Sequence, residues 1–118
     1  MEKVLRRLLE NNREINLALI SSMEGLPILS VMPPSFDETR FSAMVAALLS
    51  LSVRSVMDME IGGFKQLYIK GNDGYLLIFD SKLAVLAVST TERAKLGLLF
   101  LECERASHEI LKILKKEK

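Results

Sequence analysis

The segment from about residue 37 to residue 59 constrains the fold of this chain more than any other feature. Placed as a helix at about 100° per residue, it carries a continuous, largely apolar face, made of Phe41, Val45, Leu48, Ser52, Val56 and Met59, which Ala46, Leu49 and Val53 widen on one side. Roughly opposite lie the small residues Ala43, Ala47 and Ser50, with Arg54 below them. A helix that is apolar nearly all round is buried on more than one side. In a chain of 118 residues, a second subunit is one source of that further cover.

Length and charge restrict the other possibilities. The 118 residues fit one ordinary domain, which we expect to span residues 1–118. Lys and Arg number 16 against 15 Asp and Glu, so a formal net charge of +1 gives no general attraction to nucleic acid or to a membrane surface. The longest strongly apolar stretch without charge, Phe41 to Val53, is shorter than the roughly 20 residues of a bilayer span. We therefore expect no integral membrane segment.

Localisation is inferred from the cysteine content and the N-terminus. A lone cysteine rules out an intramolecular disulfide framework and is typical of a reducing compartment. The first residues, Met1 to Arg7, carry charges where a signal peptide would need its apolar stretch. We expect a cytoplasmic protein.

Hydrophobic periodicity predicts three helices and five strands in the order α-β-β-α-β-β-β-α. The helices are expected at residues 2–11, 37–59 and from the Thr90-Thr91-Glu92 segment to about 115, and the strands at residues 15–23, 26–32, 64–70, 75–79 and 83–89. Short turns between consecutive strands make hairpins, so the sheet should be mainly antiparallel. The two amphipathic terminal helices can cover one face and the central helix the other. The fold class is α+β.

Local signals predict how several of these elements begin and end. Ser35 and Glu38 have the spacing of a capping box for the central helix, and Thr90-Thr91 offer hydroxyl caps for the last helix. Pro27 near the start of the second strand suits an edge position, because proline cannot donate a ladder hydrogen bond. The segment from Gly71 to Gly74 is predicted to be a hairpin turn with positive φ angles.

Candidate catalytic groups are scarce. Cys103 lies on the apolar stripe of the last helix, which favours a core position over a nucleophile. His108 has no second histidine, cysteine or carboxylate at a ligand spacing, so we expect neither a metal site nor a general base there. The glycine pairs match no phosphate-binding or dinucleotide motif, and we expect no cofactor. The sequence therefore argues against an enzyme, although residues distant in sequence can still assemble a site.

The strand expected at residues 64–70 is a candidate for pairing between subunits. Phe64, Leu67, Tyr68 and Ile69 would make it an adhesive edge in a monomer. Pairing with its own copy across a two-fold axis would satisfy the ladder and remove the edge, with roughly 1,200–2,000 Å² or more buried. Edge lysines also discourage such pairing, and this strand carries Lys65 and Lys70. The alternative is that its apolar residues simply pack under the helices of one subunit.

Several segments in order resemble the roadblock/dynein light-chain superfamily, in its prokaryotic, small-GTPase-associated form. These segments are Ile15 to Pro33 (INLALISSMEGLPILSVMP), Phe41 to Val53 (FSAMVAALLSLSV), Gly71 to Ile78, Leu83 to Val88 and Leu96 to Leu98. The resemblance implies a five-stranded antiparallel sheet with the central helix on one face and the two terminal helices on the other. It also implies homodimers, in which the third strands pair and the central helices pack side by side. Family members typically associate with small Ras-like GTPases or with dynein intermediate chains.

Together, the resemblance and the edge strand give a predicted dimer interface on the central helix and the third strand. Its residues are Ala43, Ala47, Ser50, Arg54, Met57, Phe64, Gln66, Leu67, Tyr68 and Lys70. The expected function is that of a non-enzymatic, homodimeric interaction module that regulates or scaffolds a small Ras-like GTPase. The resemblance brings no catalytic residue to this chain. The alternative function is a sensor domain for a small molecule or nucleotide, which needs an enclosed cavity.

Overall fold

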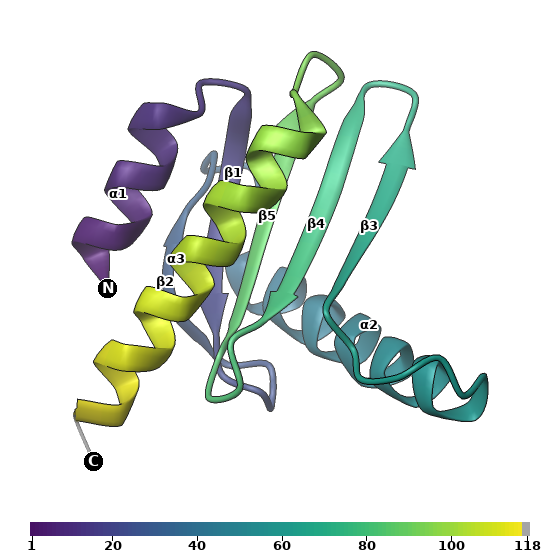
Figure 1. The fold of residues 1–118 in the computed structure, drawn as a ribbon. Helices are drawn as coiled ribbons and strands as arrows, with labels where there is room; N and C mark the ends of the chain where they lie inside the picture. The colour runs from purple at the N-terminus through teal and green to yellow at the C-terminus, as the bar shows by residue number, and fades with distance from the viewer. Residues whose placement is uncertain (117–118) are drawn as a thin grey trace.

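The computed structural model describes residues 1–116 and has the predicted order of elements (Figure 1). The bounds of the three helices and five strands are α1 Glu2–Asn11, β1 Ile15–Ser21, β2 Pro27–Val31, α2 Glu38–Asp58, β3 Gln66–Gly71, β4 Gly74–Asp80, β5 Val85–Thr91 and α3 Leu96–Lys116. The predicted α+β class is confirmed. The predicted strand and helix bounds differ from these mainly at the ends.

All five strands form one antiparallel sheet in the order β2-β1-β5-β4-β3. The middle strand, β5, pairs on one side with β1, where Ala18 lies opposite Val88, and on the other side with β4. The β2 and β3 strands form the two edges of the sheet. The prediction of an edge position for Pro27 is confirmed, as is the prediction that the third strand lies at an edge.

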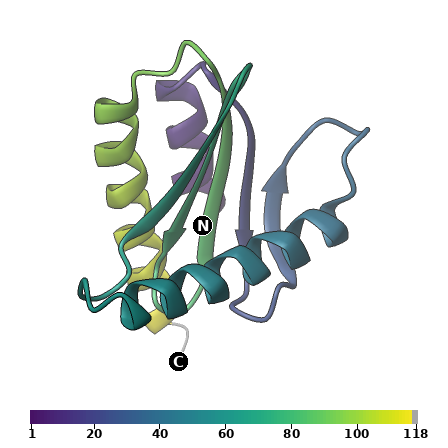
Figure 2. The ribbon, with the colours of Figure 1, turned by 90° about the vertical axis from the view of Figure 1, so that its right-hand side faces the viewer.

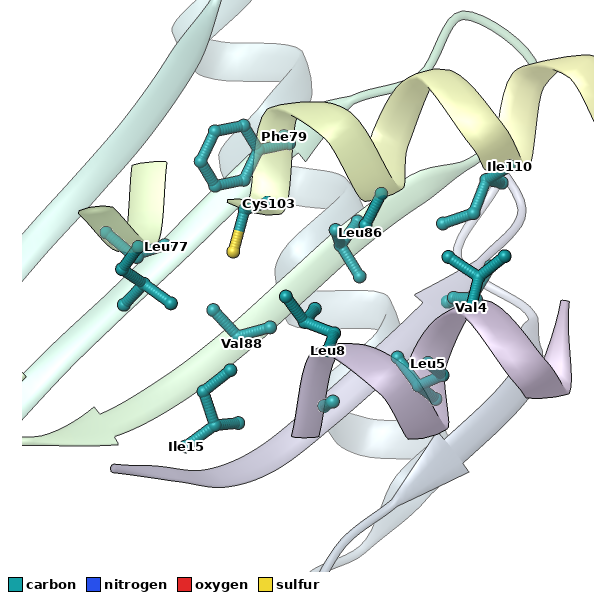
Figure 3. Close-up of a cluster of buried hydrophobic side chains, with 14 of the residues drawn as sticks. Val4, Leu5, Leu8, Ile15, Leu77, Phe79, Leu86, Val88, Cys103 and Ile110 are labelled. Atoms are coloured by element: carbon teal, nitrogen blue, oxygen red, sulfur yellow. The ribbon is translucent and has the colours of Figure 1, made fainter. Parts of the chain in front are cut away.

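The sheet separates two apolar layers because alternate residues of each strand point to opposite faces. On one face, α1 and α3 lie side by side and enclose the larger cluster, which includes Leu5, Leu77, Phe79 and Ile110 (Figures 1 and 3). On the other face, Leu19, Ile78 and Ala87 contribute to a smaller cluster with Val45 and Leu49 of α2. The predicted placement of the helices is therefore confirmed.

The predicted helix caps are wrong. The N-cap of α2 is Asp37, whose carboxylate accepts the backbone N–H of Arg40 at 3.2 Å. Glu38 does not complete a capping box with Ser35, because its carboxylate accepts the hydroxyl of Ser30. Thr90 and Thr91 both belong to β5 and α3 begins only at Leu96, so neither hydroxyl caps the last helix.

The helix α2 is longer than the sheet beneath it is wide. Its 21 residues span about 32 Å at 1.5 Å per residue, whereas five strands about 4.8 Å apart set the outer strands only roughly 19 Å from each other. Figure 1 shows α2 crossing behind the strands, with its C-terminal end projecting beyond β3, and in Figure 2 the same helix lies in front of the lower part of the strands. Met59, which follows that end, is 70% exposed, although it belongs to the apolar face predicted for this helix.

Candidate interaction surface

The outward face of α2 contains the small residues predicted for the interface. Ala43, Ala47 and Ser50 are all exposed, as are Arg54 and Met57 further along the helix. The buried residues of α2 are Ser42, Val45 and Leu49, which lie on the opposite side and all before the last nine residues of the helix. The helix is therefore covered on one side only, and its outer surface has little charge to hydrate it.

Large apolar side chains border this outer face. Met44, Leu51 and Met57 are 45%, 65% and 68% exposed, and Ile61 just beyond the helix is 71% exposed. The Arg54 guanidinium lies 3.7 Å from the carboxylate of Asp58, so the main cation of this face is paired within its own helix. Exposed apolar residues gathered along one helix make this face a candidate for contact with another molecule. Of these exposed apolar residues, the predicted interface includes Met57 and leaves out Met44, Leu51 and Ile61.

The edge strand β3 supplies the second part of the surface. Gln66 and Lys70 are exposed, and Leu67 is half-buried beside the α2 cluster. Phe64, just before the strand, also packs against that cluster, as the single-subunit alternative expected. The other side of β3 pairs with β4 throughout, so the ladder of β3 is open only at the outer edge.

Two aromatic contacts fix side chains of β3 on the α3 side of the sheet. The ring of Tyr68 meets Phe100 edge to face, with 5.7 Å between ring centroids, although Tyr68 is still 54% exposed. The ammonium of Lys70 lies 5.8 Å from the centre of the Tyr75 ring. Tyr68 and Lys70 thus point toward the α3 side of the sheet, whereas Leu67 points toward α2. The predicted interface residues of β3 therefore lie on both faces of the sheet and share only the strand edge.

The cysteine and the other ligand-type residues offer little chemistry. Cys103 is buried in the core between α3 and the sheet, as predicted (Figure 3). Burial, assisted by the charge of Glu102, raises the pKa of its thiol to about 12, so the nucleophilic thiolate does not form near neutral pH. Within residues 1–116, no three His, Cys, Asp or Glu side chains lie close enough together to hold a metal ion.

Several grooves indent the surface of the described residues, and all of them open to solvent. Their volumes range from about 80 to 320 Å³. None is the enclosed cavity that the sensor alternative needs. By length and composition alone, α2 is also apolar enough to cross a membrane, a property that the core helix of a soluble protein can share.

Comparison with known proteins places this architecture in a family. A sequence model of the Roadblock/LC7 domain matches residues 1–90. The chain is 31% identical over 107 residues to the uncharacterized protein MJ1340 of Methanocaldococcus jannaschii, covering 89% of this chain and 94% of that protein.

Two solved structures have the same fold. A Roadblock/LC7 domain from Streptomyces avermitilis superposes with a TM-score of 0.89 at 16% identity, over 98% of both chains. MglB of Myxococcus xanthus superposes with a TM-score of 0.88 at 22% identity, over 97% of this chain and 94% of MglB. The sequence match and the fold agree, and the chain belongs to the Roadblock/LC7 family.

Proposed function

We propose that this protein acts without catalysis, as a homodimer that regulates or scaffolds a small Ras-like GTPase. The observation that carries the proposal is the incomplete cover of α2, whose outer face and projecting end are apolar and exposed beside the open edge of β3. The family resemblance supports the choice of a GTPase as the partner. The scarcity of catalytic groups in the described residues supports a role in binding.

Pairing of β3 with its own copy would account for both exposed features. Two antiparallel β3 strands related by a two-fold axis would join the two sheets into one and remove both edges. The C-terminal part of α2, which projects past β3, would then lie over the sheet of the second subunit. Ala43, Ala47 and Ser50 would allow the two α2 helices to approach closely.

The first test is the oligomeric state of two variants. Ala47→Glu introduces a carboxylate between close helices, where an unpaired charge costs several kcal/mol, and Tyr68→Lys introduces charge at the strand seam. We expect each variant to sediment as a monomer in analytical ultracentrifugation at concentrations where the wild type is a dimer.

Matched controls separate loss of the dimer from loss of folding. Ala47→Ser keeps a small side chain, and Tyr68→Phe keeps the ring that meets Phe100, so both should remain dimers. Lys112→Glu changes an exposed charge on α3 and should also remain a dimer. Dimers that survive in both Ala47→Glu and Tyr68→Lys would place the subunit contact elsewhere.

The second test is binding to Ras-like GTPases of the same organism, each loaded with GDP or with a non-hydrolysable GTP analogue. We expect the wild type to retain the GTPase in one of its two nucleotide states at least tenfold better than in the other in a pull-down. The monomeric variant Ala47→Glu shows whether the dimer is required. Failure to bind any such GTPase in either state would contradict the proposed partner class.

A further inference from the structure

The edge of the sheet opposite β3 differs from the β3 edge in its charge. From Gly25 to Phe36 the chain contains no charged residue, although 26% of all residues are charged. This stretch includes the whole of β2, the other edge strand. Its exposed large side chains include Leu26, Ile28 and Val31. Edge strands usually carry lysine or other charges that discourage pairing, and β2 carries none.

A groove of about 320 Å³ runs beside this edge, between α1 and β2. Leu5 and Leu9 of α1 form one wall, and Leu29 and Val31 of β2 form the other. The groove also meets Glu2 and Arg6, whose side chains form an ion pair with each other at 2.6 Å. The groove is therefore apolar and has no unpaired charge of its own.

We propose that the β2 edge binds an extended, uncharged segment of a partner protein, which adds a sixth strand to the sheet. An open strand edge offers backbone donors and acceptors that another extended chain satisfies best. Every second side chain of the added strand points to the same face, so one large apolar side chain would lie in the groove against Leu9 and Val31. The β2 edge carries no charge, and the nearby charges of Glu2 and Arg6 pair with each other. The segment that matches this edge is therefore one without charge.

A second copy of this chain is a poor occupant of the same edge. If β3 already pairs across one two-fold axis, pairing of β2 across another would extend the sheet from subunit to subunit without closure. The exclusion of a second copy rests on the proposed homodimer. Pro27 lacks a backbone N–H, so the strand available to the partner segment is Ile28 to Val31.

A phage-displayed library of random twelve-residue peptides supplies a probe for this edge. We expect selection on the wild-type protein to enrich uncharged sequences with large apolar residues at alternate positions. The best of these peptides, synthesised and labelled, should bind in fluorescence anisotropy. Methylation of its alternate backbone nitrogens should abolish binding, and this control needs no change in the protein.

Protein variants then locate the bound peptide. Val31→Lys places a charge at the groove and should weaken binding at least tenfold, whereas Ile69→Lys makes the same kind of change on the opposite edge and should change it less than twofold. The monomeric variant Ala47→Glu should bind the peptide as the wild type does, so failure of the dimer and failure of this proposal can be told apart.

Three results would overturn the proposal. The first is that selection yields no binder, or yields mainly charged sequences. The second is that the peptide binds Val31→Lys as tightly as it binds the wild type. The third is that the wild type polymerises and Val31→Lys prevents this, which would make a second copy the occupant.

Discussion

Cys103 shows how a single residue links burial to stability. Its side chain lies in the larger apolar cluster, with Leu77, Val88 and Leu86 nearby in Figure 3. The apolar surroundings favour the neutral thiol, and the pKa rises from 9.0 to about 12 mainly for that reason. The folded protein therefore holds this proton more tightly than the unfolded chain does.

This difference predicts a loss of stability at alkaline pH. A group whose pKa is raised by folding contributes its full stabilisation below pH 9.0 and loses it as the pH rises toward about 12. At pH 10 the free energy of unfolding should fall by roughly 1 kcal/mol relative to pH 7 through Cys103 alone. Denaturant unfolding of the wild type and Cys103→Ala at both pH values isolates this effect.

Comparison with Cys103→Ala removes the contributions of all groups other than Cys103, because both proteins contain them. The absolute stability of the variant should be lower because of the lost sulfur, but its change between pH 7 and pH 10 should be smaller than that of the wild type. An equal change in the two proteins would mean that Cys103 is ionised, or accessible, in the folded state.

At the scale of elements, the β3–β4 hairpin shows why a glycine can be required for a reason other than its backbone angle. The predicted positive φ angles between Gly71 and Gly74 are wrong, because the residues of the described chain with positive φ are Gly25, Glu60, Gly62 and Lys82. Gly74 instead faces the neighbouring strand β5. A Cβ atom at Gly74 would lie 2.0 Å from the backbone carbonyl oxygen of Thr90.

We therefore expect Gly74→Ala to destabilise the protein by at least about 2 kcal/mol, because β4 or β5 would have to shift. The matched control is Gly97→Ala in the first turn of α3, where a Cβ atom meets nothing within 4 Å. That change should be neutral or stabilise by up to about 1 kcal/mol. Urea unfolding measures both, and similar losses in the two variants would contradict this account.

The order and type of the elements could be predicted from sequence because periodicity reports which residues share a face. The caps could not be predicted in the same way. Ser35 and Thr90 have side chains suited to capping, but the hydroxyl of Ser35 has a competitor in Asp37, and Thr90 continues a strand through its pairing with Ile15 and Tyr75. Local propensity yielded to tertiary pairing at these positions.

The candidate surface could be predicted only in part. The period of α2 identifies Ala43 and Ala47 as outward residues, and the structure agrees. It does not show where the sheet ends beneath the helix, so the exposure of Met59 and Leu51 could not be deduced. Whether the ten predicted interface residues contact a second subunit stays a prediction, as does the single domain over residues 1–118.

At the scale of the whole molecule, the two sheet edges divide the possible contacts of this protein. The β3 edge carries Lys70, lies beside the end of α2 and is our candidate for self-association. The β2 edge carries no charge and lies beside α1. A formal net charge of +1 gives the molecule as a whole no strong electrostatic attraction, so local charge, shape and backbone pairing at each edge should decide what binds there.

The pairing of β1 with β5 at the middle of the sheet has a consequence for how the protein folds. The β1–β2 hairpin and the three consecutive strands β3, β4 and β5 each need only local contacts, but Ala18 and Val88 are about 70 residues apart in sequence. Closing so long a loop costs chain entropy before the contacts between β1 and β5 can stabilise the fold. We expect the two halves to form early and to dock last, so that the rate of folding depends on the seam between them.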